Sequence, residues 1–376
     1  MLVRQGGPGR ATVPAVSRPW VLVLTASGGD PSRVVGGLPL ALRLALDAQR
    51  AGAAGVVVDP PSGYRAEALA DPRLRIPVGD TVPEGSRRVR AGASLLVHRD
   101  AFRAAAASDR DEVDIAAVEP DAATPFAFSA RDVVDARTAS TAEDALFRSL
   151  RKPQDGWTAR WLNRYVSLTL SRWLVKTPLS PNQVSVGILA IGLTGAYLAS
   201  IGTYGTMLAG AALFQAQSIL DGCDGEMSRV TYRGSHLGEW LDTIGDDLTN
   251  YGFFAGAALG LHAATGSDLY LAAGAVTVGS GAVASLIEYR YLLAIGSGDL
   301  LKYPTSQTAS GSGVLAAIAP LFKRDTFVLL TLIAAAVGLL GPMLVVFAIA
   351  AVGILFNVLA AEAKMARERG KVRAAR

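Results

Sequence analysis

The chain has 376 residues, of which 51% are hydrophobic, and it carries a formal net charge of +4. Its mean hydropathy of +0.33 is high for a soluble protein, and the apolar residues are concentrated after residue 150. Lys and Arg cluster beside these apolar runs, as they do at the flanks of membrane helices, so the positive charge does not indicate a nucleic-acid partner. The single cysteine, Cys223, excludes an internal disulfide and a cysteine-cluster zinc site.

The first 150 residues have ordinary polarity and predict a small soluble α/β domain. Residues 1–19 are rich in Gly, Pro and Arg and are expected to form a disordered lead-in. Helical periodicity over 36–52, between two apolar runs of strand type, predicts a βαβ unit and therefore a parallel sheet. Strands are expected at 20–25, 54–59, 75–78 and 93–98.

This α/β domain, predicted over 20–136, resembles the opening of a sugar- or inositol-phosphate cytidylyltransferase. The resemblance rests on the Gly-Leu-Pro-Leu run, on Arg43 and on the later Val-Val-Val run. It weakens where chemistry is needed, because 26–33 is a poor phosphate loop and no Lys follows Pro39. We expect a degenerate, non-catalytic domain that serves packing or dimer support. The alternative is an active CTP-using domain that makes the CDP-alcohol in place.

A polar helical stretch over 137–154 is expected to link this domain to a membrane domain over 155–376. The membrane domain opens on an amphipathic pattern, which predicts a juxtamembrane helix lying in the headgroup layer. Its aromatic residues are expected to be anchors, whereas for Arg164 contact with a substrate phosphate stays open. The pattern comprises Trp157, Trp161, Tyr165, Leu168 and Trp173, with Arg160, Arg164 and Arg172 between them.

Six apolar segments follow and predict six transmembrane helices, some near the minimum length for a span. Lys and Arg are frequent in the loops on one side of these segments and scarce on the other. By the positive-inside tendency, we expect a multi-pass cell-membrane protein with both termini and the acidic motif on the cytoplasmic side. The segments lie at 183–202, 206–229, 237–263, 268–294, 325–341 and 343–363.

Four aspartates stand within this apolar sequence at helical spacing. Asp221 and Asp224 are three residues apart, and Asp242 and Asp246 are four apart, so each pair is expected to share a helix face. Each carboxylate at membrane depth costs about 2.5–3.5 kcal/mol, so four of them indicate a site rather than solvated surface. Carboxylate oxygens suit hard cations, and we predict two bound Mg²⁺ or Mn²⁺ ions.

The complete motif runs from Asp221 to Asp246 as D-x2-D-G-x2-S-R-x8-G-x3-D-x3-D. It resembles the signature of the CDP-alcohol phosphotransferases, a family of integral membrane enzymes with Ala at the position of Ser228. The resemblance implies that the hydroxyl of an acceptor alcohol attacks the β-phosphorus of a CDP-alcohol and that CMP leaves. It implies metal ligation by Asp221, Asp224 and Asp242, with Asp246 completing the second metal site and acting as the general base. It also implies a homodimer.

Four further positions are candidates for contact with the nucleotide. Arg229 stands one turn after Gly225 and is placed to neutralise a phosphate, while Gly225 and Gly238 allow close approach of a nucleotide or helix. Asn182, in a Pro-Asn pair at the mouth of the first span, resembles the family's pair near the nucleotide pocket. Alternatively, Asn182 caps the helix.

The remaining polar residues near the motif are expected to be structural. Glu226, Glu239 and Asp247 fall off the shared helix faces, and Cys223 is expected to pack. Arg290 and Lys302 either flank a span or bind an acceptor phosphate, and the flank interpretation is preferred.

Two other functions compete with this interpretation. An intramembrane prenyltransferase also holds a diphosphate with Mg²⁺ and aspartates, but it does not explain the Gly-x2-Ser-Arg-x8-Gly part of the motif. A cation-coupled transporter would use the acids to bind ions. The sequence also leaves the identity of the two alcohols undecided. The donor could be CDP-diacylglycerol or CDP-inositol, and the product could be a phospholipid or an inositol phosphodiester.

Overall fold

The structure is a computed structural model that divides into two compact units. The first comprises Met1–Pro153 and Val230–Tyr232, and the second comprises Gln154–Arg229 and Arg233–Arg376. Trp157 and most of the predicted lead-in lie outside the residues that the structure describes. The described residues are 18–59, 64–121, 124, 126–151, 156, 158–304 and 323–374, with side chains up to 370.

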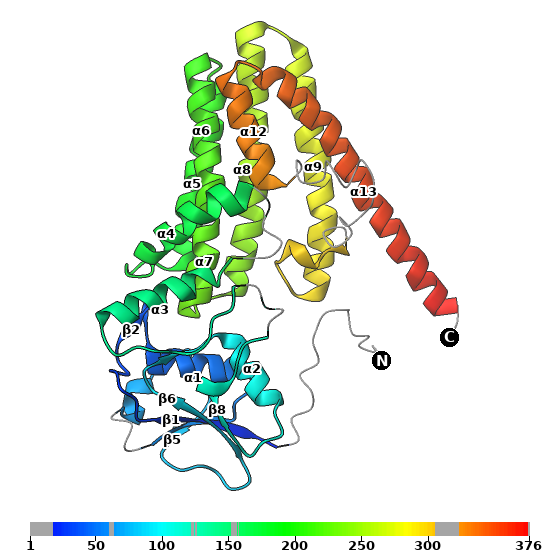
Figure 1. Cartoon of the computed structure of the whole chain (residues 1–376). Helices are drawn as coiled ribbons and strands as arrows, with labels where there is room; N and C mark the ends of the chain where they lie inside the picture. The colour runs from blue at the N-terminus through cyan, green and yellow to red at the C-terminus, as the bar shows by residue number, and fades with distance from the viewer. Residues whose placement is uncertain are drawn as a thin grey trace. The chain divides into compact units, whose positions relative to one another are not determined.

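The N-terminal unit is built on a five-stranded parallel sheet (Figure 1), which confirms the small α/β fold predicted for this part of the chain. The spatial order of the strands is β5-β4-β1-β6-β8. β1 lies at the centre, β4 and β5 follow on one side of it, and β6 and β8 follow on the other. The strands are β1 (Trp20–Thr25), β4 (Gly55–Val58), β5 (Val78–Gly79), β6 (Arg87–Gly92) and β8 (Glu112–Asp114). Short pairs β2 (Val34–Val35) with β3 (Leu38–Pro39) and β7 (Leu95–Leu96) with β9 (Arg131–Asp132) are antiparallel.

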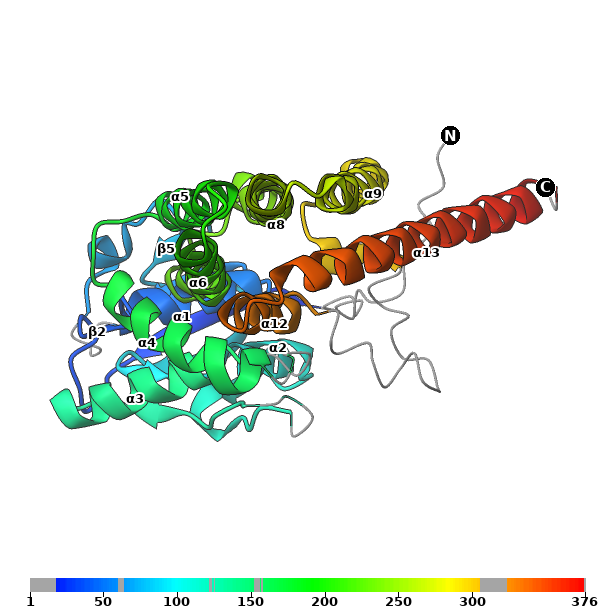
Figure 2. The same cartoon turned by 90° about the horizontal axis from the view of Figure 1, so that it is seen from above.

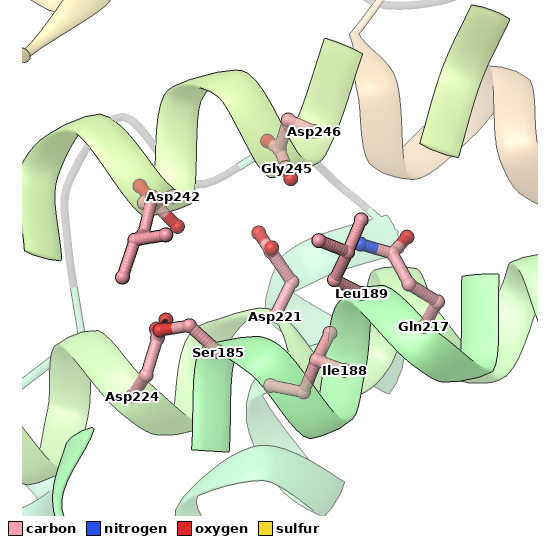
Figure 3. A pocket seen from close by; sticks show the side chains of 10 residues that line it. Ser185, Ile188, Leu189, Gln217, Asp221, Asp224, Asp242, Gly245 and Asp246 are labelled. Atoms are coloured by element: carbon pink, nitrogen blue, oxygen red, sulfur yellow. Dashed lines mark hydrogen bonds between the residues drawn. The ribbon is translucent and has the colours of Figure 1, made fainter. Parts of the chain in front are cut away.

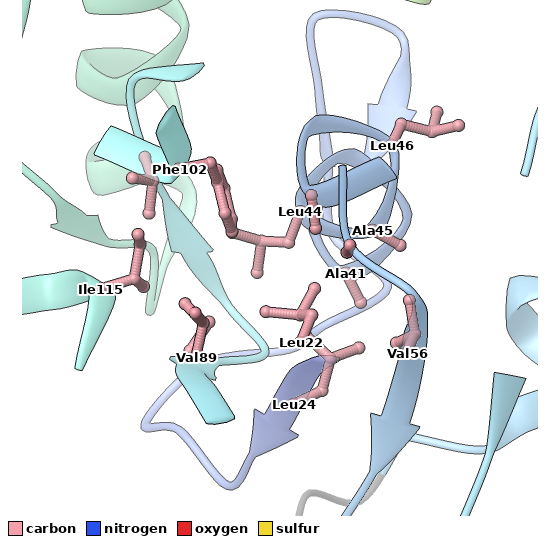
Figure 4. Close-up of a cluster of buried hydrophobic side chains, with 14 of the residues drawn as sticks. Leu22, Leu24, Ala41, Leu44, Ala45, Leu46, Val56, Val89, Phe102 and Ile115 are labelled. Atoms are coloured by element: carbon pink, nitrogen blue, oxygen red, sulfur yellow. The ribbon is translucent and has the colours of Figure 1, made fainter. Parts of the chain in front are cut away.

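The sheet packs against helices α1 (Leu40–Arg50) and α2 (Arg99–Ala107). Side chains of α1 and α2, with Phe102 among them, meet Leu22, Val56 and Val89 of the sheet in one apolar core (Figure 4). Short 3₁₀ turns follow at η2 (Ala66–Leu69) and η3 (Ile115–Ala117). Burial of this apolar face is what drives the unit to fold.

Strand β6 was not predicted, and the strand expected at 93–98 shortens to β7, outside the main sheet. Arginines alternate with small or apolar residues in β6, so the run does not read as apolar. Arg87 is nevertheless buried, because its guanidinium donates to the carbonyls of Ala106 at 2.8 Å and of Ser108. These backbone carbonyls satisfy the charged side chain of Arg87, which the sequence pattern alone would predict to be exposed.

The helix expected in the predicted linker is present as α3 (Ala136–Arg148), and it is grouped with the N-terminal unit. Asp135 caps α3, with its side chain accepting from the N–H of Thr138. The helix has a buried apolar face in an otherwise polar sequence, and this face is why it packs rather than staying free. The buried residues are Ala142, Ala145 and Phe147.

The second unit is entirely helical among its described residues, and its long helices run beside one another (Figures 1 and 2). α5 packs against α6 and α8, α8 against α9, α9 against α13, and α6 against α12. The elements are η4 (Ala159–Asn163), α4 (Arg164–Leu174), α5 (Pro181–Ser200), α6 (Tyr204–Leu220), α7 (Gly222–Thr231), α8 (His236–Thr265), α9 (Asp268–Ile295), η5 (Leu300–Lys302), α12 (Arg324–Ala336) and α13 (Leu340–Ala374).

Three of the described helices are long and apolar enough to cross a membrane: Pro181–Ser200, Asp268–Ile295 and Leu340–Gly370. The structure thus supports a membrane-associated protein, while the count of six spans stays a prediction. α6 and α12 have 17 and 13 residues, which is short for a span. α8 is long, but it carries several acidic residues.

The predicted amphipathic helix is formed by η4, a π-helical turn, and α4. Its aromatic side chains project from the unit: Trp161 and Tyr165 are each 71% exposed, and Trp173 is 74% exposed. Leu168 lies buried on the opposite side. An exposed aromatic face flanked by arginines agrees with a helix at a lipid surface.

Glycines allow α5 and α8 to approach closely. A Cβ on Gly256 of α8 would lie 2.2 Å from the carbonyl oxygen of Ala196, and one on Gly260 would lie 2.1 Å from that of Ala199. Nearer the acidic motif, a Cβ on Gly192 would lie 2.3 Å from Cγ2 of Thr249. Small residues at such contacts are the usual means of close packing between membrane helices.

Candidate active site

Three of the four predicted aspartates converge. Asp221 ends α6 as its C-cap, while Asp242 and Asp246 lie one turn apart on α8. Each offers a carboxylate oxygen within 4.8 Å of the others (Figure 3). Oxygens bound to one Mg²⁺ at about 2.1 Å lie at most about 4.2 Å apart, so a small inward movement would let the three share an ion. The residues present therefore fit a hard divalent cation.

Asp224 is not part of this closely spaced group of three. The helix is interrupted at Asp221, and Asp224 belongs to the following helix, α7. Its side chain is buried and accepts hydrogen bonds from Ser185 Oγ and, at 2.5 Å, from its neighbour Gly225 N–H. Asp224 still faces the same pocket as the other three (Figure 3).

The pocket is partly open to solvent and lies between α5, α6, α7 and α8. Its wall is acidic at the end of α6 and along α7 and α8, and it is mainly apolar on the side of α5. The lining residues are Ser185, Ile188, Leu189, Gln217, Asp221, Asp224, Leu241, Asp242, Gly245 and Asp246. Such a combination suits a charged group held beside a less polar one.

A cation also enters the acidic cluster. Arg324, the first residue of α12, has Nη1 3.0 Å from Asp221 Oδ2 and 2.7 Å from Asp246 Oδ1. Its Nη2 donates to Gln217 Oε1 at 2.7 Å. In the sequence, Arg324 directly precedes the apolar segment predicted at 325–341, and this position is typical of the basic residues that flank membrane spans. Its position beside a hydrophobic run gave no signal of this contact, which depends on how α12 packs against α6.

Asn182 does not cap α5, so that alternative is wrong. The N-cap is Ser180, whose Oγ accepts from the N–H of Gln183. The Asn182 side chain instead approaches α8, where a Cβ on Gly238 would lie 2.9 Å from Asn182 Oδ1. Two residues that the sequence singled out separately are therefore neighbours, and the missing side chain of Gly238 leaves room for the amide.

Gly225 has a comparable relation to Arg229 on α7. A Cβ at Gly225 would lie 3.1 Å from Arg229 Nη1, so the guanidinium lies against the exposed backbone of the preceding turn. This is the contact expected when a glycine makes room for an i,i+4 neighbour. The predicted pair of residues is thus in contact.

Glu226, which was expected to be structural, anchors α7 to α4. Its carboxylate is fully buried, is paired with Arg164 Nη1 at 2.7 Å, and accepts from Ser167 Oγ at 2.8 Å and Ser171 Oγ at 2.7 Å. This contact occupies the guanidinium of Arg164, for which a substrate phosphate had been considered. Cys223 is also buried, as expected for a packing residue.

Two basic residues near the end of α9, Arg290 within the helix and Lys302 after it, have protein partners. Arg290 pairs with Glu362 at 2.7 Å and is largely exposed. Lys302 Nζ donates to Ser297 Oγ at 2.6 Å. Neither residue lines the acidic pocket.

No family model matches the chain. Among curated proteins, the chain is 36% identical over 107 residues to a "Bifunctional IPC transferase and DIPP synthase" of Aquifex aeolicus, covering 28% of this chain and 24% of that protein. Proteins with the same name match from Rubrobacter xylanophilus, with 34% identity over 142 residues (38% and 31%), and from Archaeoglobus fulgidus, with 32% over 171 residues (44% and 33%). The chain therefore spans about a quarter to a third of these relatives, whose names agree with the predicted family resemblance.

Proposed function

We propose that the chain is a metal-dependent CDP-alcohol phosphotransferase. It would transfer a substituted phosphate from a CDP-alcohol to the hydroxyl of an acceptor alcohol and release CMP. The observation that carries the proposal is the convergence of Asp221, Asp242 and Asp246 in one pocket, at positions that match the motif. Relatives named as a transferase and a synthase support the same class of reaction.

The chain's own residues have separate tasks in this proposal. Asp221, Asp242 and Asp246 hold Mg²⁺ or Mn²⁺, with Asp224 as the fourth acid of the pocket. Two bound ions, when present, would grip the diphosphate and stabilise the attacking and leaving oxygens. Asp246 takes the proton of the acceptor hydroxyl, because a hydroxyl that enters the pocket to react would lie beside its carboxylate.

The CDP half of the donor is assigned to Asn182, Gly238 and Arg229. The Asn182 amide next to Gly238 can hydrogen-bond a base or ribose, and Arg229 can pair with a phosphate oxygen. Gly238 and Gly225 leave room for these two side chains. These contacts fix the CDP group that all donors of this class share, so they do not select the alcohol.

The alcohols are proposed from the N-terminal domain and the setting. The resemblance of the N-terminal domain to a sugar- or inositol-phosphate cytidylyltransferase supports an acceptor or donor of the inositol-phosphate type. Apolar helices beside the pocket are equally compatible with CDP-diacylglycerol. The N-terminal unit is proposed to be a non-catalytic support, with the pocket and both termini facing the cytoplasm and the enzyme acting as a homodimer.

Product analysis separates this proposal from its rivals. The purified full-length protein would be incubated with Mg²⁺ and a panel of CDP-alcohols and acceptors, and its by-products identified by mass spectrometry. Release of CMP together with a phosphodiester is expected for one pair. Release of pyrophosphate from a prenyl diphosphate would indicate a prenyltransferase, and ion flux into vesicles without any product would indicate a transporter.

A further inference from the structure

The guanidinium of Arg324 occupies the region where the proposed metal would bind. Its Nη1 lies 3.0 Å from Asp221 Oδ2 and 2.7 Å from Asp246 Oδ1, and these are two of the three converging carboxylates. Its Nε and Nη2 donate to Asn250 Oδ1 at 3.4 Å and to Gln217 Oε1 at 2.7 Å. A single side chain thus offsets part of the negative charge of the acidic cluster.

Neighbouring contacts fix the direction of Arg324. Asp325 Oδ2 accepts from the N–H of Ala159 at 2.7 Å, and Thr326 Oγ1 lies 3.3 Å from Thr158 Oγ1. These bonds attach the first turn of α12 to the start of η4. Arg324 is one residue earlier, about 100° around the helix, and is therefore directed to α6 and α8 instead. The ion pair follows from this anchoring rather than from a mobile surface side chain.

A divalent cation and this guanidinium cannot both keep these contacts. An ion held by Asp221, Asp242 and Asp246 would lie within a few ångströms of Nη1, where two positive charges repel each other. Without either cation, three carboxylates would face one another uncompensated, which is equally unfavourable. The cluster therefore needs one cation or the other.

We propose that Arg324 is the internal counter-cation of the acidic cluster before metal binds, and that a divalent ion displaces it from Asp221 and Asp246. The inference rests on the proposed function in treating the cluster as a metal site. Arg324 then competes with the incoming ion for Asp221 and Asp246. It also sets the metal affinity, because part of the binding free energy is used to break its ion pairs.

Metal affinity tests this exchange. Mn²⁺ binding to the detergent-purified full chain would be measured by electron paramagnetic resonance for wild type, Arg324→Gln and Arg290→Gln. The last variant is the matched control, since it removes an equal charge whose partner, Glu362, is outside the cluster. Removal of the competing cation is expected to tighten Mn²⁺ binding about tenfold in Arg324→Gln, equal to about 1.4 kcal/mol, with Arg290→Gln unchanged. An unchanged or weaker affinity in Arg324→Gln overturns the exchange.

A second measurement needs no variant. Phenylglyoxal modification of wild-type arginines would be quantified peptide by peptide with and without Mg²⁺. Modification of Arg324 is expected to become faster with Mg²⁺, while that of Arg290 stays constant; an equal or slower rate at Arg324 overturns the exchange. Wild type that binds no Mn²⁺ at all would overturn the metal site and the exchange together, whereas normal binding with an unaltered Arg324→Gln overturns only the exchange.

Discussion

The close contact of α5 and α8 yields a quantitative prediction for Gly256→Ala. The new Cβ would lie 2.2 Å from the Ala196 carbonyl oxygen, well inside an ordinary contact of about 3.4 Å. Because the clashing atom is backbone, the helices must separate. Overpacking at its upper range costs about 3 kcal/mol, and the better helix propensity of Ala returns about 1 kcal/mol. The net expectation is a loss of about 2 kcal/mol.

A loss of this size should lower the thermal midpoint by about 4–8 °C for a unit of this length. The midpoint would be measured in detergent by differential scanning fluorimetry. Gly187→Ala on α5 is the matched control, because no atom of another element lies within 4 Å of the position its new Cβ would take, and its stability should be unchanged or slightly higher. Equal midpoints for Gly256→Ala and Gly187→Ala would refute the proposed close packing.

Three further changes test other parts of the structure. Glu226→Gln leaves Arg164 without its buried charge partner and should cost about 3–5 kcal/mol, seen as a lower thermal midpoint; an unchanged midpoint contradicts this. Gly238→Ala crowds the Asn182 amide and should raise KM for the CDP-alcohol more than it alters stability, so an unaltered KM argues against this nucleotide wall. Burial, opposed by nearby Asp100, lowers the pKa of His98, so the unfolded chain gains the proton first and stability should fall as pH drops below about 6.5. Wild type should therefore melt earlier at pH 5.5 than at pH 7.5, and His98→Gln should show a smaller difference.

Strong periodicity made much of the fold predictable. Five of the six expected apolar segments coincide closely with α5, α8, α9, α12 and α13, and the βαβ start is present. What patterning missed depended on tertiary partners. β6 contains a buried arginine satisfied by distant carbonyls, and α3 became part of the N-terminal unit through three buried side chains.

The acidic site was predictable to a similar extent. Helical spacing identified Asp242 and Asp246 as one face, and the motif identified Asp221 as their partner. Spacing did not reveal the interruption of the helix at Asp221, which separates it from Asp224. Nor did it reveal Arg324, which lies 78 residues beyond Asp246 and reaches the cluster only through the packing of α12.

The central claim is that the three converging aspartates support metal-dependent release of CMP. The most direct test is CMP release by wild type and Asp246→Asn over a Mg²⁺ titration, using the donor and acceptor pair found in the product analysis. Wild type should release CMP only with Mg²⁺, lose activity with EDTA and regain it on readdition. Asp246→Asn should lose at least about 100-fold, since a metal ligand contributes at least as much as the groups that orient it. Release that is independent of Mg²⁺, or equal in the variant, would contradict the account.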